Sequence, residues 1–467
     1  MDTLSNDICW LTITEVSHLL RGKTVSPVEL TQLCLDRIER LNPKLNAFIT
    51  VTAESALDEA RAAEREIHKG HWRGPLHGVP IAMKDLFDTA GVRTTAASAV
   101  FKDRVPNQDC EVVRRLKSAG AVLLGKLNMH EFAYGGSGII GFFGPTRNPW
   151  SQEHIAGGSS SGSAAAVAAG MCYGALGSDT GGSIRLPADY CGIVGLKPTY
   201  GRVSTHGVIP LSWSCDHVGP MTRSVHDAAI MLQAIAGYDP EDPTSIDAPV
   251  PDYAATLPAT APLRVGIPRR HFYDDLDPEI ETAMAAAISR IGKIAANMRD
   301  VELALASDTM VLRAEAYAYH CESVKESSEL YQPDTVRRIR SGEAISAVDY
   351  MRTRRQMEAH RRTIRRLFDS VDVLITATSP VPPPTIAELL DDMESLRSRE
   401  ILMLRNTRPF NALGLPTISI PCGFTKTALP IGLQITGAPW AEGTVLRAAH
   451  AYERQTDWHT RHPELKG

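Results

Sequence analysis

The sequence lacks a strong net charge, since 49 Lys and Arg residues against 54 Asp and Glu residues leave −5 over 467 residues. This balance gives no electrostatic reason to expect a nucleic-acid partner. The N-terminus, MDTLSNDICW, lacks the basic and apolar regions of a secretion signal. The longest small-apolar run, around residues 162–177, is too rich in Gly, Ser and Ala to span a membrane. We therefore expect a cytoplasmic protein with neither a nucleic-acid nor a membrane partner.

The chain also lacks a C-x-x-C motif, although it contains eight cysteines. These are scattered along the chain and lie mostly among apolar or small neighbours. This pattern is typical of reduced core thiols and predicts neither a zinc site nor a redox pair. We expect no metal and no organic cofactor.

No Pro/Gly/Ser-rich linker or charged tract divides the chain. The length allows about three domains, but one large domain spanning 1–467 is the better interpretation. Residues 1–70 predict N-terminal helices that pack on its core, one of them beginning with the capping box Ser26-Pro27-Val28-Glu29 and ending at Asn42-Pro43. Residues 277–368 are helix-forming and charged, which predicts a mostly helical cap.

Two Gly/Ser loops stand out, GGSSSGS at 157–163 and GSDTGGSIR at 177–185. They bracket an Ala-rich segment that predicts a helix followed by a short apolar strand. Glycine tolerates backbone conformations that point successive N–H groups into one concavity, and such a nest binds developing negative charge. The loops are therefore candidates for a catalytic site rather than flexible linkers.

A lysine follows an apolar strand in Val79-Pro80-Ile81-Ala82-Met83-Lys84-Asp85. A lone lysine is usually a solvated surface residue. At the end of a buried strand, however, its ammonium loses hydration, which lowers its pKa and makes the neutral amine available as a base near pH 7.

Together, the two loops and the upstream P-I-A-x-K-D segment resemble the motifs of the amidase signature family of serine hydrolases. Three separated motifs in the right order are a stronger signal than any one alone. The resemblance covers nearly the whole chain and implies an α/β fold with a central mixed sheet flanked by helices. The sequence departs from the family pattern at Ser161, where glycine is usual. A serine at this position should preserve the chemistry if its φ is negative.

The resemblance also implies the roles of the site residues. Ser183 would be the nucleophile, Ser159, preceded by a cis peptide bond, would relay protons, and Lys84 would be the base. The backbone N–H groups of Thr180, Gly181, Gly182 and Ser183 would form the oxyanion hole. The cap at 277–368 would select the substrate.

The substrate-side residues are less closely defined. The segment 128–138 resembles the family's substrate loop, so Met129, Tyr134, Gly135 and Gly136 are candidates for substrate binding. Arg185 is a candidate for binding a substrate carboxylate, although bracing the loop through Asp179 is the favoured interpretation.

The main prediction is a free-standing hydrolase of small-molecule amides, whose activity would extend to carbamates and aryl esters. Two alternatives accompany it. The chain could be the glutamine-hydrolysing A subunit of a tRNA-dependent amidotransferase. The second alternative concerns the nucleophile. The first loop matches the G-x-S-x-G nucleophile elbow at Gly158-Ser159-Ser160-Ser161-Gly162, which would make Ser160 the nucleophile. We disfavour the elbow because residues 147–154 read as a turn, not the strand it requires. The family also suggests a homodimer.

Overall fold

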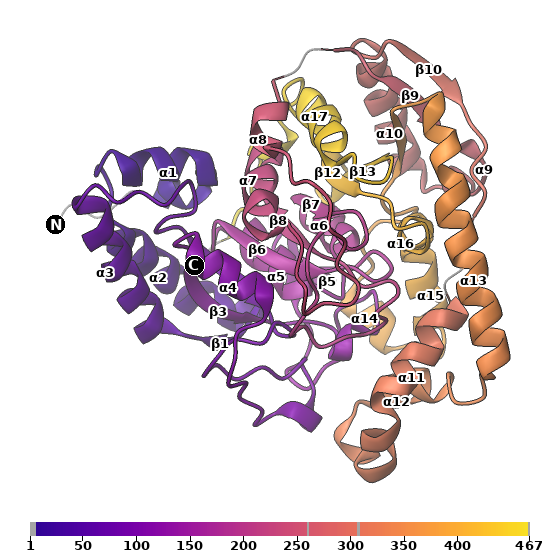
Figure 1. Cartoon of the computed structure of the whole chain (residues 1–467), viewed down its shortest axis with the longest axis horizontal. Helices are drawn as coiled ribbons and strands as arrows, with labels where there is room; N and C mark the ends of the chain where they lie inside the picture. The colour runs from indigo at the N-terminus through magenta and orange to yellow at the C-terminus, as the bar shows by residue number, and fades with distance from the viewer. Residues whose placement is uncertain (1–5, 259–260, 306–308, 466–467) are drawn as a thin grey trace.

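The structure, a computed structural model, describes residues 6–258, 261–305 and 309–465. Over these ranges an eleven-stranded mixed sheet is flanked by helices and accompanied by a two-stranded ribbon (Figure 1). The strand order in the sheet is β1-β3-β2-β6-β8-β7-β12-β13-β11-β9-β10. The predicted fold class, an α/β domain built on one mixed sheet, is confirmed.

The strands are β1 (Phe48–Val51), β2 (Pro80–Lys84), β3 (Val122–Leu127), β4 (Arg147–Asn148), β5 (Ser151–Ile155), β6 (Gly174–Ser178), β7 (Val194–Lys197), β8 (Val218–Thr222), β9 (Arg264–Ile267), β10 (Asn297–Asp300), β11 (Val373–Ala377), β12 (Thr417–Phe424) and β13 (Pro430–Gly437). The α-helices are α1 (Ile13–Arg21), α2 (Pro27–Leu45), α3 (Ala53–His68), α4 (Glu111–Ser118), α5 (Ser161–Ala168), α6 (Arg185–Cys191), α7 (Val225–Ile235), α8 (Tyr253–Thr256), α9 (Arg269–Phe272), α10 (Pro278–Gly292), α11 (Thr309–Glu326), α12 (Pro333–Arg340), α13 (Ala347–Thr363), α14 (Ile386–Leu390), α15 (Leu396–Met403), α16 (Arg408–Ala412) and α17 (Glu442–Glu453). Short 3₁₀ turns are η1 (Asn6–Trp10), η2 (Ala99–Phe101), η3 (Glu131–Ala133), η4 (Ser328–Leu330), η5 (Ile364–Asp369) and η6 (Trp458–Thr460).

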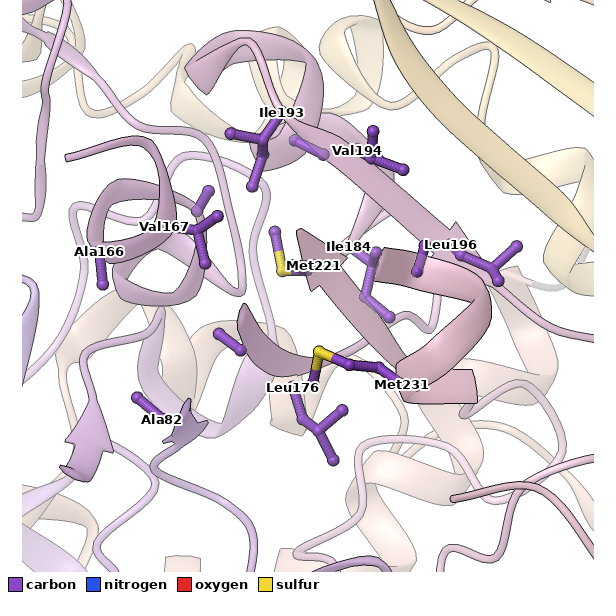
Figure 2. Close-up of a cluster of buried hydrophobic side chains, with 14 of the residues drawn as sticks. Ala82, Ala166, Val167, Leu176, Ile184, Ile193, Val194, Leu196, Met221 and Met231 are labelled. Atoms are coloured by element: carbon purple, nitrogen blue, oxygen red, sulfur yellow. The ribbon is translucent and has the colours of Figure 1, made fainter. Parts of the chain in front are cut away.

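The core lies around the central strands β2, β6, β8 and β7, whose residues are all buried. Figure 2 shows side chains of these strands, such as Leu176 and Met221, with Val167 of α5 and Ile184 beside them. Strands buried on both faces are largely apolar, and a buried Leu or Met side chain contributes about 1.5–3 kcal/mol. The small residues of α5 leave little side-chain volume between that helix and the sheet, which holds both Gly/Ser loops against the core.

The N-terminal region begins as predicted and then departs from the prediction. Ser26 and Glu29 form the expected capping box at the start of α2. The predicted end at Asn42-Pro43 is wrong, because α2 passes Pro43 and ends at Leu45. Pro43 forfeits one backbone hydrogen bond in the last turn, whereas continuing the helix buries Leu45 completely.

The expected cap over 277–368 is too wide. Within it, α10 packs on β11, β12 and β13, and β10 pairs in parallel with β9 at the edge of the sheet. These elements therefore extend the sheet layer. The remaining helices of the region, α11 to α13, lie at one side of the molecule (Figure 1), where α11 contacts both α12 and α13.

Candidate active site

The site forms where two neighbouring parallel strands end. β2 and β6 pair in parallel, with Met83 opposite Leu176, so their carboxyl ends lie at the same edge of the sheet. Lys84 is the last residue of β2 and Ser178 the last of β6. Lys84 Nζ donates a hydrogen bond to Ser178 Oγ at 2.8 Å. This edge of an α/β sheet is where ligands usually bind.

Lys84 is fully buried, and its Nζ also donates to Ser159 Oγ at 2.7 Å. Burial lowers the pKa of Lys84 to about 7, although the carboxylates of Asp179 and Asp216 oppose this shift. Near neutral pH a substantial fraction of the amine is therefore unprotonated and able to accept a proton. The second contact, with Ser178, was not predicted from the sequence, although that serine lies in the second loop.

The first Gly/Ser loop carries the middle serine. The Gly158–Ser159 peptide bond is cis, and Ser159 is fully buried. The Gly158 N–H donates to the Gly136 carbonyl at 2.7 Å, and the Ser160 N–H donates to the Ser183 carbonyl at 3.2 Å. These bonds fix the first loop to both the substrate-side segment and the second loop.

The nucleophile-elbow alternative is not favoured by the local structure, although the expectation of a turn before it was wrong. Residues Ser151–Ile155 do form a strand, β5, but this strand lies outside the main sheet, where it pairs with β4 and makes one isolated bridge, His154 with Thr385. Ser160 is fully buried, and its Oγ donates to the Ser178 carbonyl at 3.2 Å. Ser161, the departure from the family motif, is the first residue of α5 and has the helical backbone that a serine accepts.

The second loop is organised around the carboxylate of Asp179. It accepts backbone N–H groups from Gly182 at 2.8 Å and Ile184 at 3.1 Å, and the Asn411 side-chain amide at 2.8 Å. Burial raises the pKa of Asp179, but the Arg185 guanidinium outweighs burial and holds it below its usual range. The ionised carboxylate thus fixes the backbone on both sides of Ser183.

Arg185 braces this loop, and its candidacy for substrate binding is corrected. The side chain is fully buried, and all five of its N–H groups contact protein acceptors. These acceptors are the Asp179 carboxylate, the Thr407 carbonyl, Gln434 Oε1 and Asn411 Oδ1. A guanidinium with every donor used has none left for a substrate.

Replacing Arg185 with methionine should therefore lower stability strongly. The change leaves Asp179 as a buried charge without its cation, which costs about 3–5 kcal/mol in the free energy of unfolding. Urea unfolding followed by circular dichroism measures this loss. Arg269→Met is the matched control, because the Arg269–Asp300 pair is exposed and should contribute less than about 1 kcal/mol. Equal losses in the two variants would contradict the bracing role.

The predicted oxyanion amides differ in availability. Gly182 cannot offer its N–H freely, because that group already donates to Asp179 Oδ1. The N–H groups of Thr180, Gly181 and Ser183 make no hydrogen bond with the described residues. Three of the four predicted donors are thus available to a developing oxyanion.

A cleft opens beside Ser183, whose side chain is almost buried at 5% exposure. Tyr134 and Gly135, two of the candidate substrate-binding residues, line it. Met129 and Gly136 are not among its described lining residues; the Gly136 carbonyl instead holds the first loop. The described lining residues are Ala133, Tyr134, Gly135, Thr180, Gly181, Ser183, Leu211, Leu312, Arg397, Leu404 and Arg408.

Sequence reasoning missed Leu211 and, farther along the chain, four more of these lining residues: Leu312 of α11, Arg397 and Leu404 at α15, and Arg408 of α16. These four lie more than a hundred residues beyond Ser183 in the chain. No motif or spacing in the sequence links them to the Gly/Ser loops.

In residues 6–258, 261–305 and 309–465, no helix combines the length and apolar character needed to cross a bilayer. Over the same ranges, no three His, Cys, Asp or Glu side chains are grouped so that they could hold a metal ion.

The mixed sheet, with a buried lysine and serines meeting at its edge, is the arrangement expected of an amidohydrolase. Residues 29–446 match the family model described as Amidase, so the chain belongs to the amidase signature family, as its motifs predicted.

Known relatives cover almost the entire chain. It is 44% identical to the A subunit of glutamyl-tRNA(Gln) amidotransferase of Moorella thermoacetica, over 98% of this chain and 99% of that protein. It is 42% identical to an amidase of Pseudomonas putida, over 98% of each. Among solved structures, a chain from a vestigial protein complex that reveals the evolutionary origins of an s-triazine catabolic enzyme superposes with a TM-score of 0.87 at 32% identity, covering 95% of this chain and 98% of that one.

Proposed function

We propose that this chain hydrolyses the C–N bond of small carboxylic amides through an acyl-enzyme on Ser183. One observation carries the proposal: a fully buried lysine with a pKa of about 7 is hydrogen-bonded at 2.7 Å to a buried serine. The backbone of the next serine is in turn bonded to Ser183. A base, a relay and a nucleophile are thereby available in one place.

The proton path runs from the nucleophile to the lysine. As Ser183 Oγ attacks the amide carbonyl carbon, its proton passes to Ser159 Oγ, and the Ser159 proton passes to the neutral amine of Lys84. The same path in reverse protonates the nitrogen of the departing amine as the C–N bond breaks. This leaves an ester between Ser183 and the acyl group, with the relay returned to its starting state.

The free amides of the second loop would stabilise the charge that develops on the carbonyl oxygen. Thr180, Gly181 and Ser183 offer donors, and each well-placed donor contributes about 3–4 kcal/mol to the transition state in comparable sites. Water, activated through Ser159 and Lys84, then attacks the ester carbonyl. The products are a carboxylic acid and free Ser183.

The proposal extends to carbamates and activated aryl esters, since the same acyl transfer serves all three. It includes a cytoplasmic location, for which the eight cysteines, all free thiols, are typical. It also includes a homodimer and the absence of a nucleic-acid partner.

A second candidate function is the release of ammonia from glutamine as the A subunit of an amidotransferase. It is favoured by the 44% identity to such a protein over nearly the full length. In that case the chain would require partner subunits for activity.

The two functions are separated by assaying the purified chain alone. We expect it to release amine or ammonia from a panel of aliphatic and aryl amides, together with an aryl carbamate. Ammonia release from glutamine only after partner subunits are added, with no turnover of simple amides, would favour the second function. Ser183→Ala in the same assay controls for a contaminating hydrolase.

A further inference from the structure

The substrate-side segment, residues 130–138, holds the middle serine of the proton path from both sides. The backbone N–H of His130 donates to the Ser159 carbonyl at 3.1 Å. The Gly136 carbonyl accepts the Gly158 N–H at 2.7 Å. The position of Ser159 therefore depends on the shape of this segment, although none of its side chains takes part in the proton path.

The backbone of this segment is strained. Phe132 and Ala133 are both left-handed, with φ of 49° and 58°. Residues other than glycine adopt this conformation at a cost in free energy, and it persists at functional sites where the surrounding structure enforces it. One enforcing contact is made by Glu131, whose Oε2 accepts the N–H of Gln332, just before α12, at 2.9 Å. The segment thus keeps its shape through contacts with elements distant in the chain.

Glu400 of α15 holds the other end of the segment. Its Oε1 accepts the Ser137 hydroxyl at 2.7 Å and the Ser137 N–H at 3.1 Å. Both residues are fully buried, so these bonds do not compete with water. Burial raises the pKa of Glu400, but the Arg338 guanidinium outweighs burial and lowers it to about 2. Glu400 is therefore a carboxylate throughout the working pH range.

Arg338 of α12 links this carboxylate to a second point of the segment. Its Nη1 lies 2.6 Å from Glu400 Oε2 and also donates to the Tyr134 carbonyl. Two other groups lie farther from Glu400, Arg397 Nη1 at 3.6 Å and His130 Nδ1 at 3.8 Å. The buried pair of Arg338 and Glu400 thus fastens the segment at both Tyr134 and the serine three residues later.

We propose that Glu400 and Arg338 are positioning residues that fix Ser159 for proton transfer. They act through the substrate-side segment, which passes any displacement on to Ser159 through the two hydrogen bonds that flank it. Proton transfer requires each group of the path to lie within hydrogen-bond reach of the next, and a misplacement of about 1 Å costs roughly 100-fold in rate. This inference rests on the proposed function and adds two residues to its machinery.

The test compares Glu400→Gln with a matched control, Glu442→Gln. Glu400→Gln removes the charge that pairs with Arg338 and should let the segment shift. Glu442 is equally buried and is paired with the buried Arg202 at 3.5 Å, outside the segment. The readout is the rate constant for labelling of Ser183 by phenylmethylsulfonyl fluoride, which requires the proton path but no amide substrate. We expect at least about tenfold slower labelling in Glu400→Gln and a change below about twofold in Glu442→Gln.

A background without the Ser159 hydroxyl separates positioning from general damage. In Ser159→Ala there is no hydroxyl to position, so adding Glu400→Gln should change the residual labelling rate by less than about twofold. A purely structural role would lower the rate by the same factor in both backgrounds, and that result would overturn the proposal. Labelling of Glu400→Gln at the wild-type rate would overturn it as well.

Ser137→Ala provides a milder variant in case Glu400→Gln does not fold. It removes the hydroxyl bond to Glu400 but leaves the N–H bond, so we expect labelling about threefold slower than in the wild type, and no slowing in Ser159→Ala. An unchanged rate in Ser137→Ala with Ser159 present would count against the proposal.

The amide panel distinguishes failure of this inference from failure of the proposed function. If the wild type is labelled on Ser183 and Glu400→Gln slows this labelling, but no amide of the panel is hydrolysed, the amidase proposal fails and the positioning role stands. If amides are hydrolysed and Glu400→Gln labels as fast as the wild type, the positioning role fails alone. A wild type that is neither labelled on Ser183 nor active would overturn both.

Discussion

Ser183→Ala is expected to lower kcat by roughly 10⁴- to 10⁶-fold, as happens when a nucleophile acting within a catalytic unit is removed. The attacking oxygen is lost, whereas the loop that carries it is held by Asp179, Arg185 and Asn411, which the substitution leaves in place. The unfolding midpoint should therefore stay close to that of the wild type. Steady-state kinetics on the best amide of the panel, together with urea unfolding, measures both quantities.

Ser160→Ala is the matched control, because it removes a neighbouring serine hydroxyl from the other loop. Ser160 Oγ donates only to the Ser178 carbonyl, so its loss should leave kcat within about tenfold of the wild type. A dead Ser160→Ala alongside an active Ser183→Ala would establish the elbow mechanism and reject Ser183 as the nucleophile.

The second large effect is expected at Lys84. Lys84→Met keeps most of the side-chain volume but removes the base, so kcat should fall by roughly 10²- to 10⁴-fold. In the wild type, the base works only when its amine is neutral. With a pKa of about 7, kcat/KM should be low in acid, reach half its maximum near pH 7 and level off above it. A pH profile of kcat/KM over this range measures the midpoint.

Two further variants test whether that midpoint belongs to Lys84. Burial raises the pKa of Asp216 itself to about 7, and its carboxylate form raises the pKa of Lys84. Asp216→Asn should therefore remove the Asp216 titration and move the Lys84 midpoint to lower pH. Lys126 is equally buried, but its Nζ donates to the Phe87 carbonyl, so Lys126→Met should leave the midpoint where it is. If the midpoint shifts in Lys126→Met, or does not shift in Asp216→Asn, a group other than Lys84 sets it.

The part of the site that lies close together in sequence could be predicted. The apolar run before Lys84 indicated a strand end, and β2 does end there. The Ala-rich segment between the loops indicated a helix and then a strand, as α5 and β6 are. In each case the signal is local, because the residues that decide the structure are neighbours in the chain.

The wall of the cleft could not be predicted, because its position depends on tertiary packing. Leu404 and Arg408 reach Ser183 only because α15 and α16 lie against the second loop, where the Thr407 hydroxyl donates to the Gly181 carbonyl at 2.7 Å. The predicted helical cap wrongly included the strand β10, because the polar sequence of this strand, NMRD, has no strand pattern. Its position is set by pairing with β9.

Arg185 illustrates a different limit. Its sequence position, two residues after the nucleophile, suits either a substrate ligand or a brace. Only its contacts with Asn411 and Gln434, contributed by distant segments, decide between the two.

The central claim is that Ser183 forms a covalent acyl-enzyme. The most direct test is to react the protein with a sulfonyl fluoride, digest it and locate the modified serine by mass spectrometry. We predict a single adduct on Ser183, formed faster as the pH rises through 7 and absent from both Ser183→Ala and Lys84→Met. An adduct on Ser160, or equal labelling of the Lys84→Met variant, would contradict the mechanism.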